Sequence, residues 1–328
     1  MTDTPLDVVG IGNAIVDVLV RADDAFLEAH ALTKGAMTLI DEARAGSLYA
    51  DMGPGVEMSG GSAANTMAGL AAMGGRGAFI GKVRDDQLGA VFADDIRAAG
   101  VRFDTPPAAD GAPTARCLVV VTPDAQRTMG TFLGASVELG PDDVDDDLVG
   151  AAQITYLEGY LWDPPGAKQA FRKAQRIAHA NRRRVALSLS DPFCVERHRA
   201  EFAELVAAHV DILFANEAEI TSLYQVDSFD DALQRVSGHC EVAALTRGEK
   251  GSVVVHGGEV HVVDAHPVDA VIDTTGAGDL YAAGFLYGLT RGRGLAECAR
   301  LGGVAAAEVI SHIGARAQAD LARLAASG

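Results

Sequence analysis

Apolar blocks of strand length alternate along this chain with longer, alanine-rich blocks whose apolar residues recur at helical spacing. The short blocks predict buried strands over residues 8–11, 154–157, 185–189, 212–214, 242–245 and 253–255. The longer blocks predict helices over residues 62–73, 166–180, 200–208, 218–223 and 280–289. Strands that alternate with helices in this way indicate an α/β fold with a parallel sheet.

One stretch breaks this alternation. Residues 114–121 and 127–133 flank Thr122-Pro123-Asp124-Ala125-Gln126, which is typical of a β-hairpin turn. Residues 16–20 and 36–40 are expected to add companion strands. A small sheet that interrupts an α/β domain suggests a lid over the carboxyl ends of the main strands, where open α/β sheets bind ligands. We therefore expect a large domain formed by residues 1–15, 46–110 and 137–328, and a lid formed by residues 16–45 and 111–136.

Composition and charge narrow the class of protein. The chain has 328 residues, 48% of them hydrophobic, which is enough for a sizeable core in one or two domains. Its 27 Lys and Arg against 45 Asp and Glu leave a net charge of −18, which disfavours nucleic acids and anionic membranes as partners. Four isolated cysteines, no secretory signal and no apolar run of membrane-spanning length predict a cytoplasmic protein with reduced thiols.

The strongest local signal is Asp273-Thr274-Thr275-Gly276-Ala277-Gly278-Asp279, which is followed by a helical pattern. The backbone N–H groups from Gly276 to Asp279 would converge on an anion at the helix start. The Asp279 carboxylate would then lie beside that anion as a base toward a hydroxyl group. The simpler interpretation is a glycine-containing helix start whose aspartate only complements the helix dipole.

A second glycine-rich turn, Gly60-Gly61-Ser62-Ala63-Ala64-Asn65, precedes the helix expected over residues 62–73. Ser62 is expected to cap this helix, and Asn65 would point back toward its start. Together with Asp17, which follows the first strand, this turn would supply hydrogen-bonding groups for vicinal hydroxyls. The alternative is an ordinary strand-to-helix turn with Asn65 facing solvent. The inner face of the helix is expected to comprise Met67, Leu70, Ala71 and Met73.

Other cofactor and metal motifs are incomplete. Gly10-Ile11-Gly12 begins like a dinucleotide-binding loop but lacks the third glycine, and Gly81-Lys82 lacks the Ser or Thr that ends a P-loop. The nine histidines show no spacing typical of a zinc site. A nicotinamide-dependent dehydrogenase is therefore only a distant alternative.

The two glycine-rich segments resemble the two signatures of the ribokinase-like, or phosphofructokinase-B, carbohydrate kinases. The order of the other features supports the resemblance over nearly the whole chain: Asp17 after the first strand, the hairpin, Asn216-x-x-Glu219, and residues 246–251. The resemblance implies a three-layer α/β/α domain with a mostly parallel central sheet and a small β-sheet lid. It also implies ATP-dependent transfer of the γ-phosphoryl group to a primary hydroxyl of a sugar-like substrate.

The resemblance also implies a role for each matching residue. Asp279 matches the family's catalytic base. The family's anion hole is matched by Gly276, Ala277 and Gly278. The positions that bind substrate match Asp17, Gly61 and Asn65, with Arg127 in the hairpin matching an arginine that reaches the transferred phosphate. The nucleotide-binding positions match Asn216, Thr246 and Gly248, and the metal positions match Glu219 for Mg²⁺ and Asp273 and Thr275 for a monovalent cation. The implied cofactors are ATP and Mg²⁺, with K⁺ as a further candidate.

Within the family, residues 12–17 resemble the opening of adenosine kinases, in which Asn13 would contact the nucleoside. This implies phosphorylation of the 5′-hydroxyl of adenosine, giving AMP and ADP. An apolar slot for adenine would draw on Met37, Leu39, Ile40, Leu133, Tyr160 and Trp162.

Two alternatives remain open at this point. A kinase for a free sugar (ribose, fructose or a keto-deoxy sugar acid) would use the same machinery. A non-catalytic nucleoside sensor is less favoured, because it would not need Asp279. The expected partners are a small-molecule substrate and ATP, without nucleic acid or membrane, and both a monomer and a homodimer are compatible with the sequence.

Overall fold

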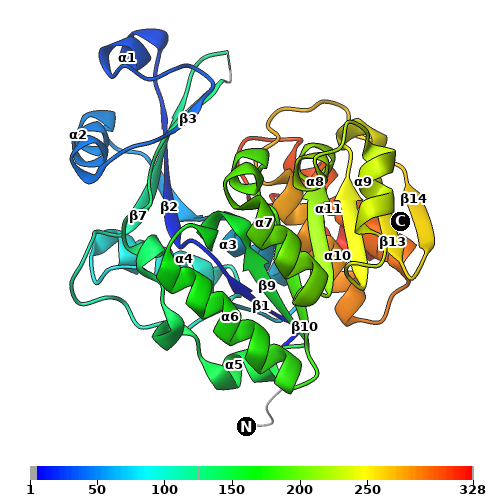
Figure 1. Cartoon of the computed structure of the whole chain (residues 1–328). Coiled ribbons are helices and arrows are strands. Elements are labelled where there is room, and N and C mark those ends of the chain that lie inside the picture. Colours follow the sequence, from blue (N-terminus) through cyan, green and yellow to red (C-terminus); the bar gives the residue numbers. More distant parts are fainter. Residues whose placement is uncertain (1–5, 125, 327–328) are drawn as a thin grey trace.

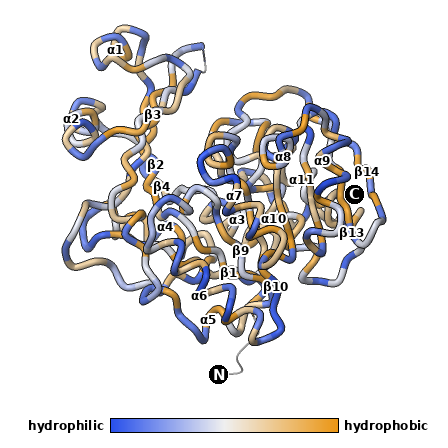
Figure 2. The backbone as a smooth tube through the Cα atoms, viewed as in Figure 1, coloured by the Kyte–Doolittle hydropathy of each residue, from blue (hydrophilic) through white to orange (hydrophobic). Residues whose placement is uncertain are grey.

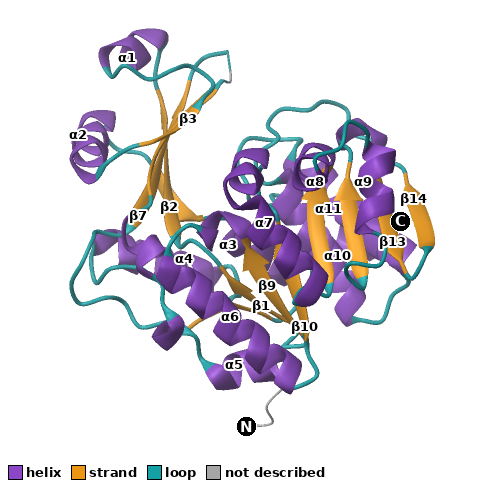
Figure 3. Cartoon of the chain, in the orientation of Figure 1, coloured by secondary structure: helices purple, strands orange, loops and turns teal. Residues whose placement is uncertain are grey.

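The computed structural model describes residues 6–124 and 126–326, and its strands form two sheets (Figures 1 and 3). Residues 1–5, where no signal sequence is expected, and Ala125 of the expected hairpin turn lie outside the described residues. The large sheet has the strand order β14 (Glu259–Val263), β13 (Ser252–His256), β12 (Val242–Thr246), β11 (Ile212–Asn216), β10 (Arg184–Ser188), β9 (Ile154–Glu158), β1 (Val8–Ile11), β5 (Gly77–Ile80) and β6 (Arg102–Phe103).

The large sheet is parallel from β12 to β6, and β13 and β14 extend it with antiparallel pairs. Every strand predicted from the apolar blocks is present, with ends that differ by at most two residues. Because the seven parallel strands run in one direction, their carboxyl ends meet at one edge of the sheet. The mostly parallel α/β architecture expected from the sequence is confirmed.

Helices cover both faces of the large sheet, so the body has three layers (Figure 1). One hydrophobic cluster includes side chains of α3 (Ser62–Ala72), α4 (Gln87–Ala98), α10 (Ala277–Thr290) and α11 (Leu295–Val309). The other includes side chains of α5 (Asp146–Ala151), α6 (Pro165–Ala180), α7 (Pro192–Ala208), α8 (Glu217–Tyr224) and α9 (Phe229–Val236). Neighbouring strand residues such as Tyr156 and Leu157 face opposite clusters, as the pleat requires. Hydrophilic stretches of the tube lie mainly at the periphery (Figure 2).

The small sheet projects from the body and has the strand order β3 (Met37–Leu39), β8 (Arg127–Phe132), β7 (Ala115–Val121), β2 (Ile15–Arg21) and β4 (Val56–Gly60) (Figure 1). The hairpin predicted from the sequence is β7–β8, and the predicted companion strands are β2 and β3. Helices α1 (Asp24–Ala29) and α2 (Glu42–Met52) lie beside this sheet. The chain passes between the two sheets at short connections from β1 to β2 and from β4 to α3, which places Asn13 and Gly61 at the junction.

Short elements complete the fold: the helix α12 (Leu321–Ala326) and the 3₁₀ turns η1 (Gly134–Glu138), η2 (Pro141–Asp143), η3 (Gly159–Trp162) and η4 (Gly248–Lys250). Helix α7 begins at Pro192, earlier than the expected helix over residues 200–208, because the Asp191 side chain accepts a hydrogen bond from the backbone N–H of Cys194. Among the described residues, no helix combines the length and apolar character needed to span a membrane.

Candidate active site

The turn before α10 is built for a ligand that approaches the backbone. Gly276 has φ +79°, and a Cβ there would lie 2.8 Å from the Cβ of Ala315, so glycine is required. A Cβ on Gly278 would meet no atom within 4 Å, which leaves open space beside the first helical turn. Among the described residues, the N–H groups of Gly276, Gly278 and Asp279 have no acceptor, whereas the N–H of Ala277 donates to the carbonyl oxygen of Thr274 (3.2 Å). Three of the four expected N–H groups are thus available to an anion.

The Asp279 carboxylate, in the first turn of α10, is held by two residues of α3. Ser62 Oγ donates to Asp279 Oδ1 (2.6 Å), and Asn65 Nδ2 donates to Asp279 Oδ2 (3.1 Å). Burial raises the pKa of Asp279, while these hydrogen bonds and the charge of Arg316 oppose the rise. The two glycine-rich segments are therefore brought together, although more than 200 residues separate Asn65 from Asp279.

Two expectations about the α3 segment need correction or resolution. Ser62 does not cap α3: Gly61 is the N-cap, and the Ser62 hydroxyl donates to Asp279 instead. Asn65 does not face solvent, since only 6% of the residue is exposed. Its Oδ1 atom is buried without a hydrogen-bond partner among the described residues, which leaves an acceptor for an incoming hydroxyl.

Asp17 lies on β2, beside the end of β4. A Cβ on Gly60 would lie 2.5 Å from Asp17 Oδ2, so the glycine makes room for this carboxylate. Burial, with a smaller contribution from the charge of Asp279, raises the pKa of Asp17 to about 6 against the opposing charges of Arg127 and Arg316. Asp17 packs against Gly60, two residues before Ser62, and Ser62 donates to Asp279, so Asp17 lies in the same site as the α10 turn.

Asn13 is held by Glu158, a residue that sequence reasoning did not single out. Glu158 Oε1 accepts hydrogen bonds from Asn13 Nδ2 (2.7 Å) and Asn13 N (3.3 Å), and its Oε2 accepts one from Ala63 N (2.8 Å). Ser136 Oγ donates to Asn13 Oδ1 (2.9 Å). Burial raises the pKa of Glu158 to about 7. The sequence signal that could have revealed Glu158 is its position as an acidic residue at the carboxyl end of an apolar strand, because that edge of the sheet binds ligands.

Asn216 and Glu219 form a capping box at the start of α8. Asn216 Nδ2 donates to Glu219 Oε1 (2.6 Å) and Asn216 N to Glu219 Oε2 (3.0 Å), while Glu219 N donates to Asn216 Oδ1 (2.9 Å). Asn216 is also the register partner of Thr246 at the ends of β11 and β12. The turn after β12 contains Gly248, and a Cβ on this glycine would meet no atom within 4 Å. These three predicted nucleotide-binding residues therefore share one edge of the sheet.

Arg127 of the small sheet pairs with Asp273 of the segment that precedes α10. The Arg127 guanidinium, at the start of β8, forms an ion pair with Asp273 Oδ2, and the two side chains are only 10% and 8% exposed. Asp273 also accepts hydrogen bonds from the N–H groups of Thr275 (3.0 Å) and Gly314 (2.9 Å). Burial raises the pKa of Asp273, but these hydrogen bonds and the charge of Arg127 outweigh it, so the pKa is lowered overall. The sequence predicted separate ligands for the two side chains, a phosphate and a monovalent cation, and did not anticipate this contact.

Arg316 is a second residue that sequence reasoning missed. It follows α11 in an irregular segment, where a lone arginine carries no signal. Its Nη2 atom donates to the carbonyl oxygen (2.7 Å) and Oγ (2.8 Å) of Ser59, and its Nη1 donates to the carbonyl oxygen of Ala64 (3.1 Å). Arg316 thus donates hydrogen bonds to the backbone before and after Gly60-Gly61.

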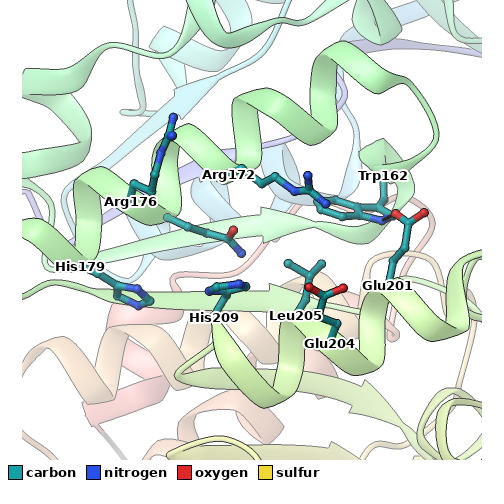
Figure 4. Close-up of a pocket in the computed structure, with 9 residues that line it drawn as sticks. Trp162, Arg172, Arg176, His179, Glu201, Glu204, Leu205 and His209 are labelled. Atoms are coloured by element: carbon teal, nitrogen blue, oxygen red, sulfur yellow. Dashed lines mark hydrogen bonds between the residues drawn. The ribbon is translucent and has the colours of Figure 1, made fainter.

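A cavity of about 580 Å³ lies elsewhere, between α6 and α7 (Figure 4). Of the residues considered for the site from the sequence, only Trp162 lines it. The expectation that Trp162 helps form an adenine slot is wrong, because the indole is fully buried in the cluster beneath these helices, 5.7 Å from the Phe171 ring centroid. Its N–H donates to Glu201 (2.6 Å). The cavity is therefore separate from the Asp279 site.

Comparisons with known proteins agree with this geometry. The family model described as pfkB family carbohydrate kinase matches residues 41–321. Adenosine kinase from Sinorhizobium meliloti is a structural neighbour with a TM-score of 0.90 and 56% identity, covering 98% of this chain and 99% of that one. A probable sugar kinase from Rhizobium etli has a TM-score of 0.91 and 51% identity, covering 98% of both chains. Adenosine kinase from Saccharomyces cerevisiae is 27% identical over 93% of this chain and 94% of that protein.

Proposed function

Because this chain belongs to the pfkB family of carbohydrate kinases and is an ATP-dependent phosphotransferase, we propose that it transfers the γ-phosphoryl group of ATP to the 5′-hydroxyl of adenosine, giving AMP and ADP. The observation that carries the phosphoryl-transfer site is the meeting of Asp279 with Ser62 and Asn65 at a helix start that has free N–H groups. The choice of adenosine is supported by the similarity to the Sinorhizobium meliloti adenosine kinase over almost the whole chain.

In this proposal Asp279 is the general base. As the 5′-oxygen attacks the γ-phosphorus, the hydroxyl proton passes to the Asp279 carboxylate and the bond to the β,γ-bridging oxygen breaks, which releases ADP. The free N–H groups of Gly276, Gly278 and Asp279 would stabilise the charge that develops on the transferred group, with the Ala277 N–H holding the turn.

The acceptor side of the site would be formed at the junction of the two sheets. Asp17 and Asn65 Oδ1, which has no partner among the described residues, would accept hydrogen bonds from ribose hydroxyls, and Gly61 allows the turn to pack against the carbonyl oxygen of Asn13. Asn13 keeps one amide N–H for the base, because Glu158 accepts only the other.

The nucleotide side would use Thr246, Gly248 and Asn216. Mg²⁺ suits Glu219, a buried carboxylate whose pKa is raised to about 7 by burial and by the nearby charge of Asp191, since a cation would stabilise its ionised form. Mg²⁺ would neutralise charge on the phosphates of ATP. Each Glu219 oxygen accepts one hydrogen bond from Asn216, which leaves a lone pair on each for the ion or for a water bound to it.

The requirement for K⁺ is a separate part of the proposal. Asp273 and Thr275 remain the candidate residues, and Asp273 already forms an ion pair with the Arg127 guanidinium. Arg127 would leave Asp273 to meet the transferred phosphate, and a monovalent cation would then compensate the Asp273 charge.

We extend the proposal to the division of the chain. Residues 16–45 and 111–136 would act as a lid on the domain formed by residues 1–15, 46–110 and 137–328, except that β4 (Val56–Gly60) pairs with β2 in the small sheet and would belong to the lid. We also propose that the enzyme works in the cytoplasm, as a monomer or a homodimer. The lid assignment is supported by the small sheet that projects from the body (Figure 1).

The test is a coupled ADP-release assay with ATP, Mg²⁺ and K⁺ across adenosine, inosine, ribose, fructose and a keto-deoxy sugar acid. We expect kcat/KM for adenosine to exceed the other values by at least ~100-fold, roughly 2.7 kcal/mol of transition-state discrimination. Preference for a free sugar would favour the second candidate, which the similarity to the Rhizobium etli probable sugar kinase supports. Ligand binding without turnover of any acceptor would instead indicate a sensor.

A further inference from the structure

We propose that Arg316 is a positioning residue for phosphoryl transfer, which fixes the Gly60-Gly61 turn beside Asp17 and Asp279. This inference rests on the proposed kinase function and adds to it a residue from outside the two glycine-rich signatures. It follows from the contacts of Arg316, from the segment that carries it and from the charges that face it.

The contacts of Arg316 lock the turn from both ends. Its two Nη atoms reach the backbone carbonyl of Ser59 before the turn and that of Ala64 after it. Ser59 is itself fixed, because its N–H and Oγ both donate to Asp95 Oδ2 (2.8 and 2.6 Å). Asp17, on β2, packs against Gly60 and therefore lies beside a turn whose position is set by the planar guanidinium.

The short segment that carries Arg316 contacts the small sheet and both glycine-rich turns. Ile313 packs against the hydrophobic face of the small sheet, next to Val119. The Gly314 N–H donates to Asp273, and Ala315 lies against Gly276 at the start of α10. One segment thus connects the small sheet, the anion-binding turn and, through Arg316, the acceptor-binding turn.

The electrostatics point the same way. The groups that interact with Asp279 are the acidic Asp17 and Glu158, the phenols Tyr156 and Tyr160, and the cationic Arg316. Arg316 lowers the pKa values of Asp17 and Asp279 against burial, and it is the cation that acts on Asp279. Without it, Asp279 would hold its proton to higher pH and would be a base in fewer molecules at a given pH.

The experiment compares three variants of the full chain with the wild type. R316M removes the charge and keeps much of the bulk, whereas R316K keeps the charge without the planar fork. R300M is the matched control. Arg300 also donates a hydrogen bond to a backbone carbonyl oxygen, that of Ala325, but its ion-pair partner is Glu297 on α11, away from the site. The readouts are kcat, KM for ATP, KM for the acceptor and the pH profile of kcat/KM.

For R316M we expect kcat to fall by about 100-fold, with KM for ATP within about 3-fold of the wild type. The acidic limb of kcat/KM should move to higher pH by about one unit. For R316K we expect the acidic limb of the kcat/KM profile to stay at the wild-type pH, and kcat to be about 10-fold higher than in R316M. R300M should match the wild type in all four readouts. A purely structural role for Arg316 would lower the melting temperature without moving the limb.

The outcomes separate the two proposals. A wild-type protein that turns over no acceptor overturns the kinase function itself. An active wild type, with R316M folded and matching its kcat and pH profile, overturns the role of Arg316 alone. If R316M does not fold, R316K becomes the deciding variant. A reduced kcat with the acidic limb of kcat/KM at the wild-type pH supports the positioning role of Arg316. A shifted acidic limb or an unchanged kcat contradicts that role.

Discussion

The Asp279 carboxylate is held by donors that do not carry charge. Ser62 takes one oxygen and Asn65 the other, so the side chain is fixed in direction without a short ion pair. A carboxylate locked in a salt bridge would be a weaker base, because an adjacent cation strongly lowers its pKa. Burial raises the pKa of Asp279 instead, which suits proton abstraction.

Replacing this residue tests its role directly. Asp279→Ala should reduce kcat by about 10³- to 10⁴-fold, since it removes the base, and acceptor affinity measured by calorimetry should stay within about 5-fold. Asp94→Ala, on the exposed side of α4, is the control and should keep full activity. Near-wild-type turnover of Asp279→Ala would show that another group takes the proton.

The β4–α3 junction depends on one glycine. Gly61 has φ +97°, and a Cβ there would lie 2.2 Å from the carbonyl oxygen of Asn13. Gly74 also has a positive φ, +86°, but a Cβ there would meet no atom within 4 Å. The two positions therefore share the conformational cost of a side chain and differ in the steric one.

This pair gives a prediction for the junction. Gly61→Ala should lower kcat/KM by about 100-fold or more and lower the melting temperature, because Asn13 or Asp17 must shift; both quantities are measured on purified protein. Gly74→Ala should cost about 1–2 kcal/mol of stability and leave kcat/KM unchanged. Equal activity losses in the two variants would mean that backbone strain, rather than contact with Asn13, is responsible.

Hydrophobic periodicity predicted the strands whose apolar side chains fill the two clusters, because burial on both faces gives continuous apolar runs. It did not predict β4 or β5, which are short and contain glycine, or α7 back to Pro192, where Asp191 supplies the cap. Asp279 and Asn65 were recognised from local spacing. Ser62 was misassigned as a cap because its partner, Asp279, lies 217 residues away. Glu158 and Arg316 likewise act through contacts that only the fold creates.

The whole molecule consists of a body and a projecting small sheet, and two of the connections between them are the short ones beside the site (Figure 1). We expect the small sheet to close when both substrates are bound, because phosphoryl transfer to an alcohol must exclude water. Small-angle scattering should show a smaller radius of gyration with adenosine and a non-hydrolysable ATP analogue than with the analogue alone. An unchanged radius would contradict closure.

Buried carboxylates also set the pH dependence of stability. The pKa values of Asp17, Glu158 and Glu219 are raised from 3.8, 4.5 and 4.5 to about 6, 7 and 7. Between the unfolded and folded values the native state binds more protons, so stability falls as pH rises from about 5 to 8. Calorimetric melting of the ligand-free protein should show this decline, and Glu158→Gln should reduce it. Stability that rises over this range would show that these groups are ionised in the folded protein at lower pH.

The order of the site residues along the chain has a consequence for synthesis on the ribosome. Asp17 and Asn65 emerge early, whereas Asp279 and Arg316 emerge only after the last strand, β14. Strand β1 itself lies between β5 and β9, so the first residues made wait for a strand near the middle of the chain before they are enclosed. A nascent chain therefore presents an acceptor site without a base or an anion-binding turn, and it cannot consume ATP until translation has passed the segment that completes the enzyme.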